Sequence, residues 1–244
     1  MRRLVFFTTA IGVVLACVGV AFAVDNTEEF KASASPYKRL STKKTKVGVN
    51  LGLDITMRNT AGGKPAELSR ITFLFPAGAK VNSKAFPTCD PVKLDKLGPS
   101  VCRRAQIGTG SAVADASPVL PRADATLRIF NGTPQGGKPR ITVWAHATVL
   151  SVTLVFSGLL VKRSGKYSYK LALDIPPIPT LPGNPNASVP EIHVKVGKKI
   201  RVKGKTVNFI ESPTRCPASG FPFRWEIGYF DGPTGAGDFL LPCP

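Results

Sequence analysis

The stretch VGVNLGLDITMR, Val47 to Arg58, decides the fold class. Apolar residues occupy every second position from Val47 to Met57, and glycines or polar residues lie between them. Successive side chains of a strand point to opposite faces of a sheet. The alternation therefore predicts a strand with one buried and one solvated face.

Similar segments recur along the chain between glycine- and proline-containing turns. They cover residues 68–76, 105–115, 124–132, 140–150, 151–175 with a turn at Ser164-Gly165, 191–211 and 223–232. No stretch of ten or more residues shows the apolar spacing of a helix. Many short strands predict an all-β protein, an antiparallel β-sandwich over residues 46–244. The proline-rich segment 176–190 is expected to be a long loop, since proline cannot donate to a central ladder.

The first 23 residues, MRRLVFFTTAIGVVLACVGVAFA, have the pattern of an export signal. Two arginines precede an apolar run, and Ala21-Phe22-Ala23 provides a small-residue cleavage site, so cleavage after Ala23 is expected. Two alternatives stay open: an uncleaved membrane anchor over residues 4–23, or a lipid anchor at Cys17. Each of them predicts a secreted or envelope-associated protein. Residues 24–45 are expected to form an extended leader.

Four cysteines follow the signal: Cys89, Cys102, Cys216 and Cys243. An even number of cysteines in an exported chain indicates two disulfides, and three pairings are possible. The simplest is local, Cys89 with Cys102 and Cys216 with Cys243, which would brace the sandwich. No two of these cysteines have the close spacing of structural zinc ligands, and no metal site is predicted.

The glycines of GTGSAVADA, Gly108 to Ala116, match a dinucleotide fingerprint only in part. Val113 stands where the third small residue belongs, and no apolar strand precedes Gly108. The better interpretation is a strand in which the glycines permit a bulge or a close backbone approach. No cofactor is expected.

The chain is strongly basic, with 33 Lys and Arg against 15 Asp and Glu, a net charge of +18. Loss of the two signal arginines would leave +16. One basic cluster predicts an anion-binding surface; it comprises Lys195, Lys198, Lys199, Arg201, Lys203 and Lys205. The expected partners are an acidic cell-wall polymer, an anionic lipid surface or another envelope protein. Nucleic acid is not expected as a partner of an exported chain.

Residues that could support catalysis are few. His146 and His193 both lie in strand-like segments, and no nucleophile elbow or metalloprotease motif occurs. The sequence therefore predicts a non-catalytic binding or structural module. Two alternatives stay open: a polysaccharide hydrolase using a carboxylate pair such as Asp54 and Glu211, and a carrier of small apolar ligands between the sheets.

The cysteine-containing segments also show a family resemblance. The motifs FPAGAK, FPTC and GPSVCRRAQIGTGSA, followed by FIESPTRCPASGFPFRWEIGYFDG, resemble a group of exported, uncharacterised bacterial proteins. In that group a C-x(n)-C loop precedes an IGTG or VGTG strand. The resemblance covers residues 71–232 and implies secretion and an immunoglobulin-like sandwich. It implies no active site.

Overall fold

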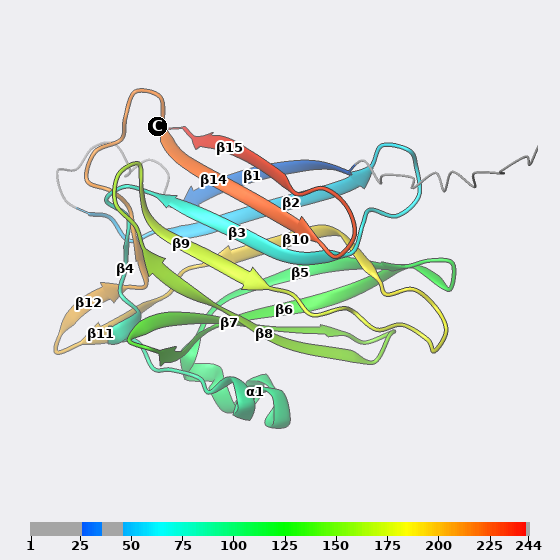
Figure 1. Cartoon of the computed structure of the whole chain (residues 1–244). Coiled ribbons are helices and arrows are strands. Elements are labelled where there is room, and N and C mark those ends of the chain that lie inside the picture. The colour runs from blue at the N-terminus through cyan, green and yellow to red at the C-terminus, as the bar shows by residue number, and fades with distance from the viewer. Residues whose placement is uncertain (1–25, 36–45, 243–244) are drawn as a thin grey trace, which may run out of the picture.

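The computed structural model describes residues 26–35 and 46–242, which form a mostly antiparallel β protein (Figure 1). The main sheet contains, in chain order, β1 (Asn26–Ser35), β2 (Asn50–Asn59), β3 (Leu68–Pro76), β5 (Gln106–Ala116), β6 (Leu120–Gln135), β7 (Lys138–Ala147), β8 (Val152–Lys162), β9 (Tyr167–Asp174), β10 (Ser188–Val196), β14 (Phe221–Tyr229) and β15 (Gly235–Leu241). Their spatial order is β1-β2-β10-β5-β6-β7-β8-β9-β3-β14-β15. The antiparallel all-β prediction is confirmed. The strands form one continuous sheet, however, where the sequence predicts the two sheets of a sandwich.

The sheet nearly closes on itself, because its two edge strands, β1 and β15, contact each other without pairing. We call this boundary the seam, and side chains of β1 and β14 make contacts across it. The Phe30 ring of β1 stacks on Trp225 of β14 with 4.2 Å between ring centroids. Near the start of β1, the Tyr229 hydroxyl donates a hydrogen bond of 2.7 Å to Glu28 Oε1. The seam is thus closed by aromatic packing and a side-chain hydrogen bond.

Glycines allow the sheet to bend sharply at two places. A Cβ on Gly110 of β5 would lie 2.2 Å from the His193 carbonyl oxygen of β10, and one on Gly158 of β8 would lie 2.1 Å from the Ala172 carbonyl oxygen of β9. Only glycine tolerates such an approach. These bends lie between the wall that contains β2, β3 and β14 and the wall that contains β5 to β8 (Figure 1).

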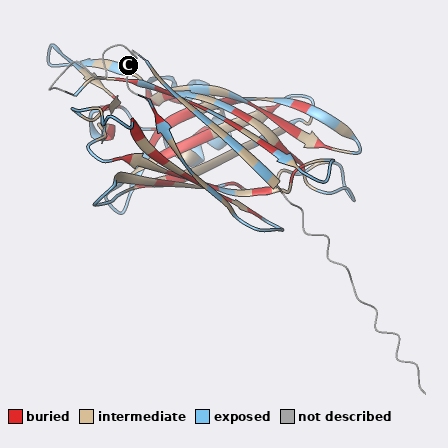
Figure 2. Cartoon of the chain, turned by 90° about the horizontal axis from the view of Figure 1, so that it is seen from above, coloured by how far each residue is buried: buried red, intermediate tan, exposed pale blue. Residues whose placement is uncertain are grey.

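Buried residues alternate with more exposed ones along the strands (Figure 2). The predicted inward positions of β2, from Leu51 to Met57, are all buried, and β14 has the same alternation from Phe221 to Tyr229. Aromatic rings fill the side of the interior next to the seam, where Phe223 of β14 stacks on Phe239 of β15.

Residues 83–105 form a loop that covers the outer face of β6, β7 and β8. It contains two 3-10 helices, η2 (Ser83–Ala85) and η3 (Pro99–Ala105), and the short helix α1 (Pro91–Leu97), which begins with an Asp90 cap. The predicted Cys89–Cys102 disulfide is confirmed and closes this loop. Leu94 and Phe130 pack beside the disulfide and are fully buried. The partner predicted for Cys216, Cys243, lies outside the described residues, so that bond stays a prediction.

Two segments differ from the sequence analysis. Part of the expected leader, Asn26–Ser35, is strand β1 and pairs with β2 along its length. The proline-rich loop ends before residue 190, because β10 begins at Ser188. Pro190 lies where the register shifts between Ser188 and Glu191, so its missing amide interrupts no regular ladder.

Two small sheets complete the fold at one end of the molecule. β4 (Lys80–Val81) pairs with β13 (Ile210–Glu211), and β11 (Lys199–Val202) pairs with β12 (Lys205–Asn208). Within residues 26–35 and 46–242, no helix has the length and apolar character needed to span a membrane.

Candidate functional site

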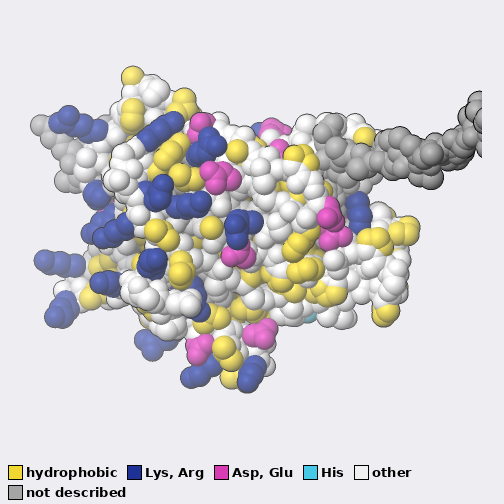
Figure 3. Space-filling view, in the orientation of Figure 1, with side chains coloured by type: hydrophobic (Ala, Val, Ile, Leu, Met, Phe, Trp, Pro, Cys, Tyr) yellow, Lys and Arg dark blue, Asp and Glu magenta, His cyan; other side chains and the backbone are white. Residues whose placement is uncertain are grey.

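Lysine and arginine gather at one end of the molecule, which we call the basic end (Figure 3). The β11–β12 hairpin projects from this end and has Lys199, Arg201, Lys203 and Lys205 exposed. No acidic residue occurs between Lys195 and Lys205. The hairpin therefore presents four cations with no carboxylate of its own to neutralise them.

The hairpin sequence determines this display. Ile200 and Val207 pair across the two strands and pack against the core. Lys199 and Arg201 alternate with Ile200 and are exposed. Lys203 and Gly204, with φ angles of 48° and 77°, form a tight turn of the kind that joins two-residue hairpins. The apolar face thus anchors the hairpin, and its cations face solvent.

A polar groove of about 420 Å³ lies beside the hairpin. Arg103 of η3, Lys195 of β10 and Lys198 contribute its cations, and Asn50, Gln106 and Thr109 contribute neutral polar groups; no carboxylate lines it. Lys198 Nζ donates a hydrogen bond of 2.8 Å to the Arg104 carbonyl oxygen. Burial lowers the pKa of Lys198. The groove could hold a phosphate, sulfate or carboxylate group.

The structure therefore brings the predicted surface residues together and adds two that sequence reasoning missed. Arg103 and Arg104 follow Cys102 directly, and η3 places them beside Lys198. Their signal was the Cys-Arg-Arg triplet, but nothing in the sequence indicated that this loop lies against the end of β10.

The opposite end of the sheet has a different character. Five carboxylates lie at or near strand ends there: Glu67, Asp115, Asp124, Asp174 and Asp231. The turns of this end also expose Val119, Val149 and Leu181. Among the described residues, the β11–β12 hairpin and its groove thus differ from this end in having cations with no carboxylate among them.

Both histidines make side-chain hydrogen bonds on the outer face of the sheet. His193 Nδ1 lies 2.8 Å from Asp54 Oδ1, and His146 Nδ1 lies 2.8 Å from Thr153 Oγ1. Both residues lie in strands, β7 and β10, as the sequence predicts. Among the described residues, no group of three or more His, Cys, Asp or Glu side chains is arranged to hold a metal ion.

The carboxylate pair considered for a hydrolase does not come together. Asp54 bonds to His193, whereas Glu211 pairs with Lys80 and bridges to Gly48, six residues before Asp54. Six residues of strand span about 20 Å, which is too far for two acids flanking one glycosidic bond. Gly108 and Gly110 lie inside antiparallel β5 and precede no helix, as expected for a strand.

Comparisons of the chain with family models, curated proteins and solved structures find no match. The assignment of the candidate site therefore rests on the geometry of the structure.

Proposed function

We propose that this chain is an exported, non-catalytic protein of the cell envelope that binds an acidic polymer through its basic end. One observation carries the proposal: the cations of the β11–β12 hairpin and of the adjacent groove face solvent with no carboxylate among them. Export is inferred from residues 1–23, which lie outside the described residues. Membership of an immunoglobulin-like family also stays a prediction.

A repeating polyanion suits this surface better than a small anion does. The groove can take one anionic group, and the hairpin offers further cations beside it, so several groups of one polymer can bind together. Such multivalent binding increases the overall affinity without any single strong contact. Because most of the cations are exposed, the attraction should weaken as salt increases.

The test uses the triple variant Lys199→Gln, Arg201→Gln and Lys205→Gln. Its matched control replaces three exposed cations away from the hairpin, Lys31, Arg58 and Arg122, with glutamine. The control and the hairpin variant therefore have the same net charge. We expect polyphosphate and polyglutamate, measured by calorimetry at low and physiological salt, to bind the hairpin variant about tenfold more weakly, and the control nearly as well as the unmodified chain.

An equal loss in both variants would show that net charge alone drives binding and would overturn the assignment to the basic end. Vesicles containing phosphatidylglycerol form a second arm. If they bind more tightly than both polymers, the partner is a lipid surface and the polymer proposal is wrong.

A further inference from the structure

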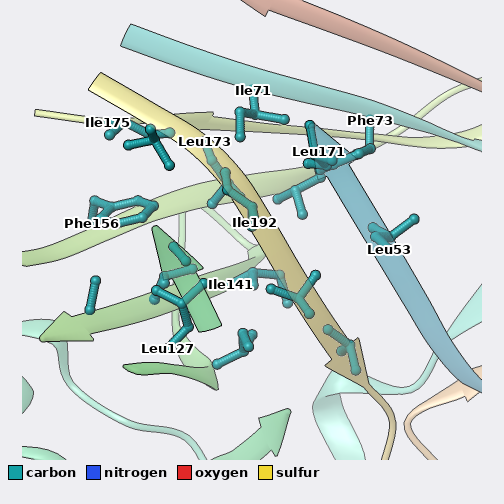
Figure 4. Close-up of a pocket in the computed structure, with 18 of the residues that line it drawn as sticks. Leu53, Ile71, Phe73, Leu127, Ile141, Phe156, Leu171, Leu173, Ile175 and Ile192 are labelled. Carbon is teal, nitrogen blue, oxygen red and sulfur yellow. The ribbon is translucent and has the colours of Figure 1, made fainter. Parts of the chain in front are cut away.

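An apolar chamber lies inside the sheet, on the side away from the aromatic seam. Its volume is about 190 Å³. Side chains from strands far apart in the sequence, among them Leu53, Leu127 and Ile192, point into the same space (Figure 4). Apart from Tyr169 and His146, every residue that lines it is apolar, and the His146 ring itself lies on the outer face against Thr153.

Small residues on one wall create this space. Ala112 of β5, Ala125 of β6 and Ala147 of β7 are direct neighbours across three adjacent strands. Ala114 and Ala145 also line the chamber, on β5 and β7. A methyl group reaches much less far from the sheet than a leucine side chain does, so this wall is recessed where these alanines lie, at the end near the β5–β6 and β7–β8 turns.

The residues on the adjoining strands β8 and β9 do not fill the recess. Leu154, Phe156 and Leu173 line the chamber yet are only partly buried. A packed interior leaves few voids larger than a water molecule, and dry engineered cavities of about 150 Å³ already bind benzene. Water needs two to four polar partners, which these walls do not offer. The chamber is therefore suited to an apolar ligand.

The shape of the chamber points to a chain. Its lining extends from Ile141 to Ala147 on β7 and from Val189 to Val196 on β10, a length of about 20 Å. About 10–15 Å³ accommodates one water-sized group, so the chamber holds on the order of a dozen such groups. A space this long and this small is narrow, which favours an unbranched chain over a fused ring system.

One end of the chamber offers the easier access. At the basic end, paired β4 and β13 and the perpendicular Phe86 and Phe209 rings close the interior. At the other end, Ile178 of the proline-rich loop lines the chamber, and Leu181 of the same loop is exposed. Val119 and Val149 are also exposed, on turns at this end. We call the group of Val119, Val149 and Leu181 the apolar rim.

We propose that the chamber binds one unbranched alkyl chain, as in a fatty acid, which inserts from the apolar rim and leaves its polar head in water. This site goes beyond the polymer-binding function and shares no residue with the basic hairpin. The two proposals can therefore fail separately.

The test titrates the full chain with octanoate, decanoate, laurate, myristate and palmitate, below the concentrations at which they aggregate. Affinity should increase about fourfold for each added CH2 group and level off near a dozen carbons. Dodecanol should bind about as well as laurate, since no charged side chain lines the chamber. No binding, or no dependence on chain length, would overturn the proposal.

The variant Ala125→Phe locates the site. A phenylalanine there would fill part of the chamber, so laurate binding should fall at least about tenfold while thermal stability is kept or increased. Ala236→Leu, on the exposed outer face of β15, is the matched control and should bind normally. Both variants retain the apolar run of residues 4–23, which controls for binding outside the sheet.

If Ala125→Phe does not fold, Ala145→Leu on the neighbouring strand provides the same comparison. Laurate that binds a folded chamber-filled variant as tightly as the unmodified chain would place the site elsewhere and overturn the proposal. Polyphosphate binding should be unchanged in these variants, which separates this result from the test of the basic end.

Discussion

At the scale of single residues, Asn131 connects the disulfide-closed loop of residues 83–105, which we call the stapled loop, to the sheet. Its side chain is completely buried; Oδ1 accepts a hydrogen bond from Ser83 Oγ, and Nδ2 donates to the carbonyl oxygens of Ser83, Phe86 and Pro87. Its own carbonyl oxygen accepts from the Cys89 amide. One amide thus fixes the start of the loop. Asn131-Gly132-Thr133 also matches the N-glycosylation sequon, and the burial of Asn131 makes that site inaccessible in the folded chain.

Asn131→Ala should lower the free energy of unfolding by about 3 kcal/mol, because it leaves buried carbonyl groups without a donor. Urea denaturation measures the change. The comparison variant Asn184→Ala, at an exposed position in the proline-rich loop, should change stability by less than about 0.5 kcal/mol. Similar small losses in both variants would contradict the anchoring role of Asn131.

At the scale of elements, the stapled loop depends on its crosslink. Helix α1 has only seven residues, which is too short to be stable alone. Removing the Cys89–Cys102 bond with a double alanine variant should cost about 3 kcal/mol, the entropy of a loop of this size. Far-UV circular dichroism should still show the sheet, since its strands and core lie outside the loop. Loss of the β-sheet signal at room temperature would show that the sheet itself depends on the disulfide.

The sequence predicts the strongly alternating strands well. β2, β3 and β14 have large apolar residues on one face, and β3 has the predicted bounds. The edge strands β1 and β15 were not predicted from the sequence, and both omissions have the same physical reason. The inward positions of β1 and β15 include Ala32, Ala34, Gly235 and Gly237, which give little hydrophobic signal. Their burial depends on neighbours that are distant in the sequence.

Strand neighbours also explain why the near closure of the sheet could not be predicted. β10 lies between β2 and β5, and β9 lies beside β3, and no local pattern specifies either arrangement. The basic hairpin was found because its cations are consecutive in the sequence. The chamber depends on alanines that lie side by side on three neighbouring strands, so the sequence allowed an apolar-ligand carrier only as an alternative.

At the scale of the whole molecule, we expect the seam to lose stability at alkaline pH. Burial, and then the hydrogen bond to Glu28, raise the pKa of Tyr229 above its usual value. The folded state therefore retains the phenol proton where the unfolded chain loses it. This contribution to stability is fully present below about pH 10, the pKa of an unfolded tyrosine, and is lost as pH rises further.

The variant Tyr229→Phe cannot titrate at this position. Above pH 10, the unfolding free energy of the unmodified chain should fall more steeply than that of the variant, by at most about 1.4 kcal/mol per pH unit. At neutral pH the variant should be less stable by about 1 kcal/mol, the value of one lost hydrogen bond. Denaturation curves measured from pH 8 to 11 test both statements. If the unfolding free energies of the two proteins fall in parallel with pH, the Tyr229 proton does not contribute to the stability of the seam.

The contact between β1 and β15 has a consequence for synthesis. β1 ends at Ser35 and β15 begins at Gly235, about 200 positions later. A ribosome must therefore release the chain through β15 before the two edge strands can meet. Until then, Phe30 and Trp225 cannot meet, and two strand edges stay open to pairing with other molecules. A truncated product that stops before residue 235 should consequently be prone to aggregate, even though most of its sheet could already have formed.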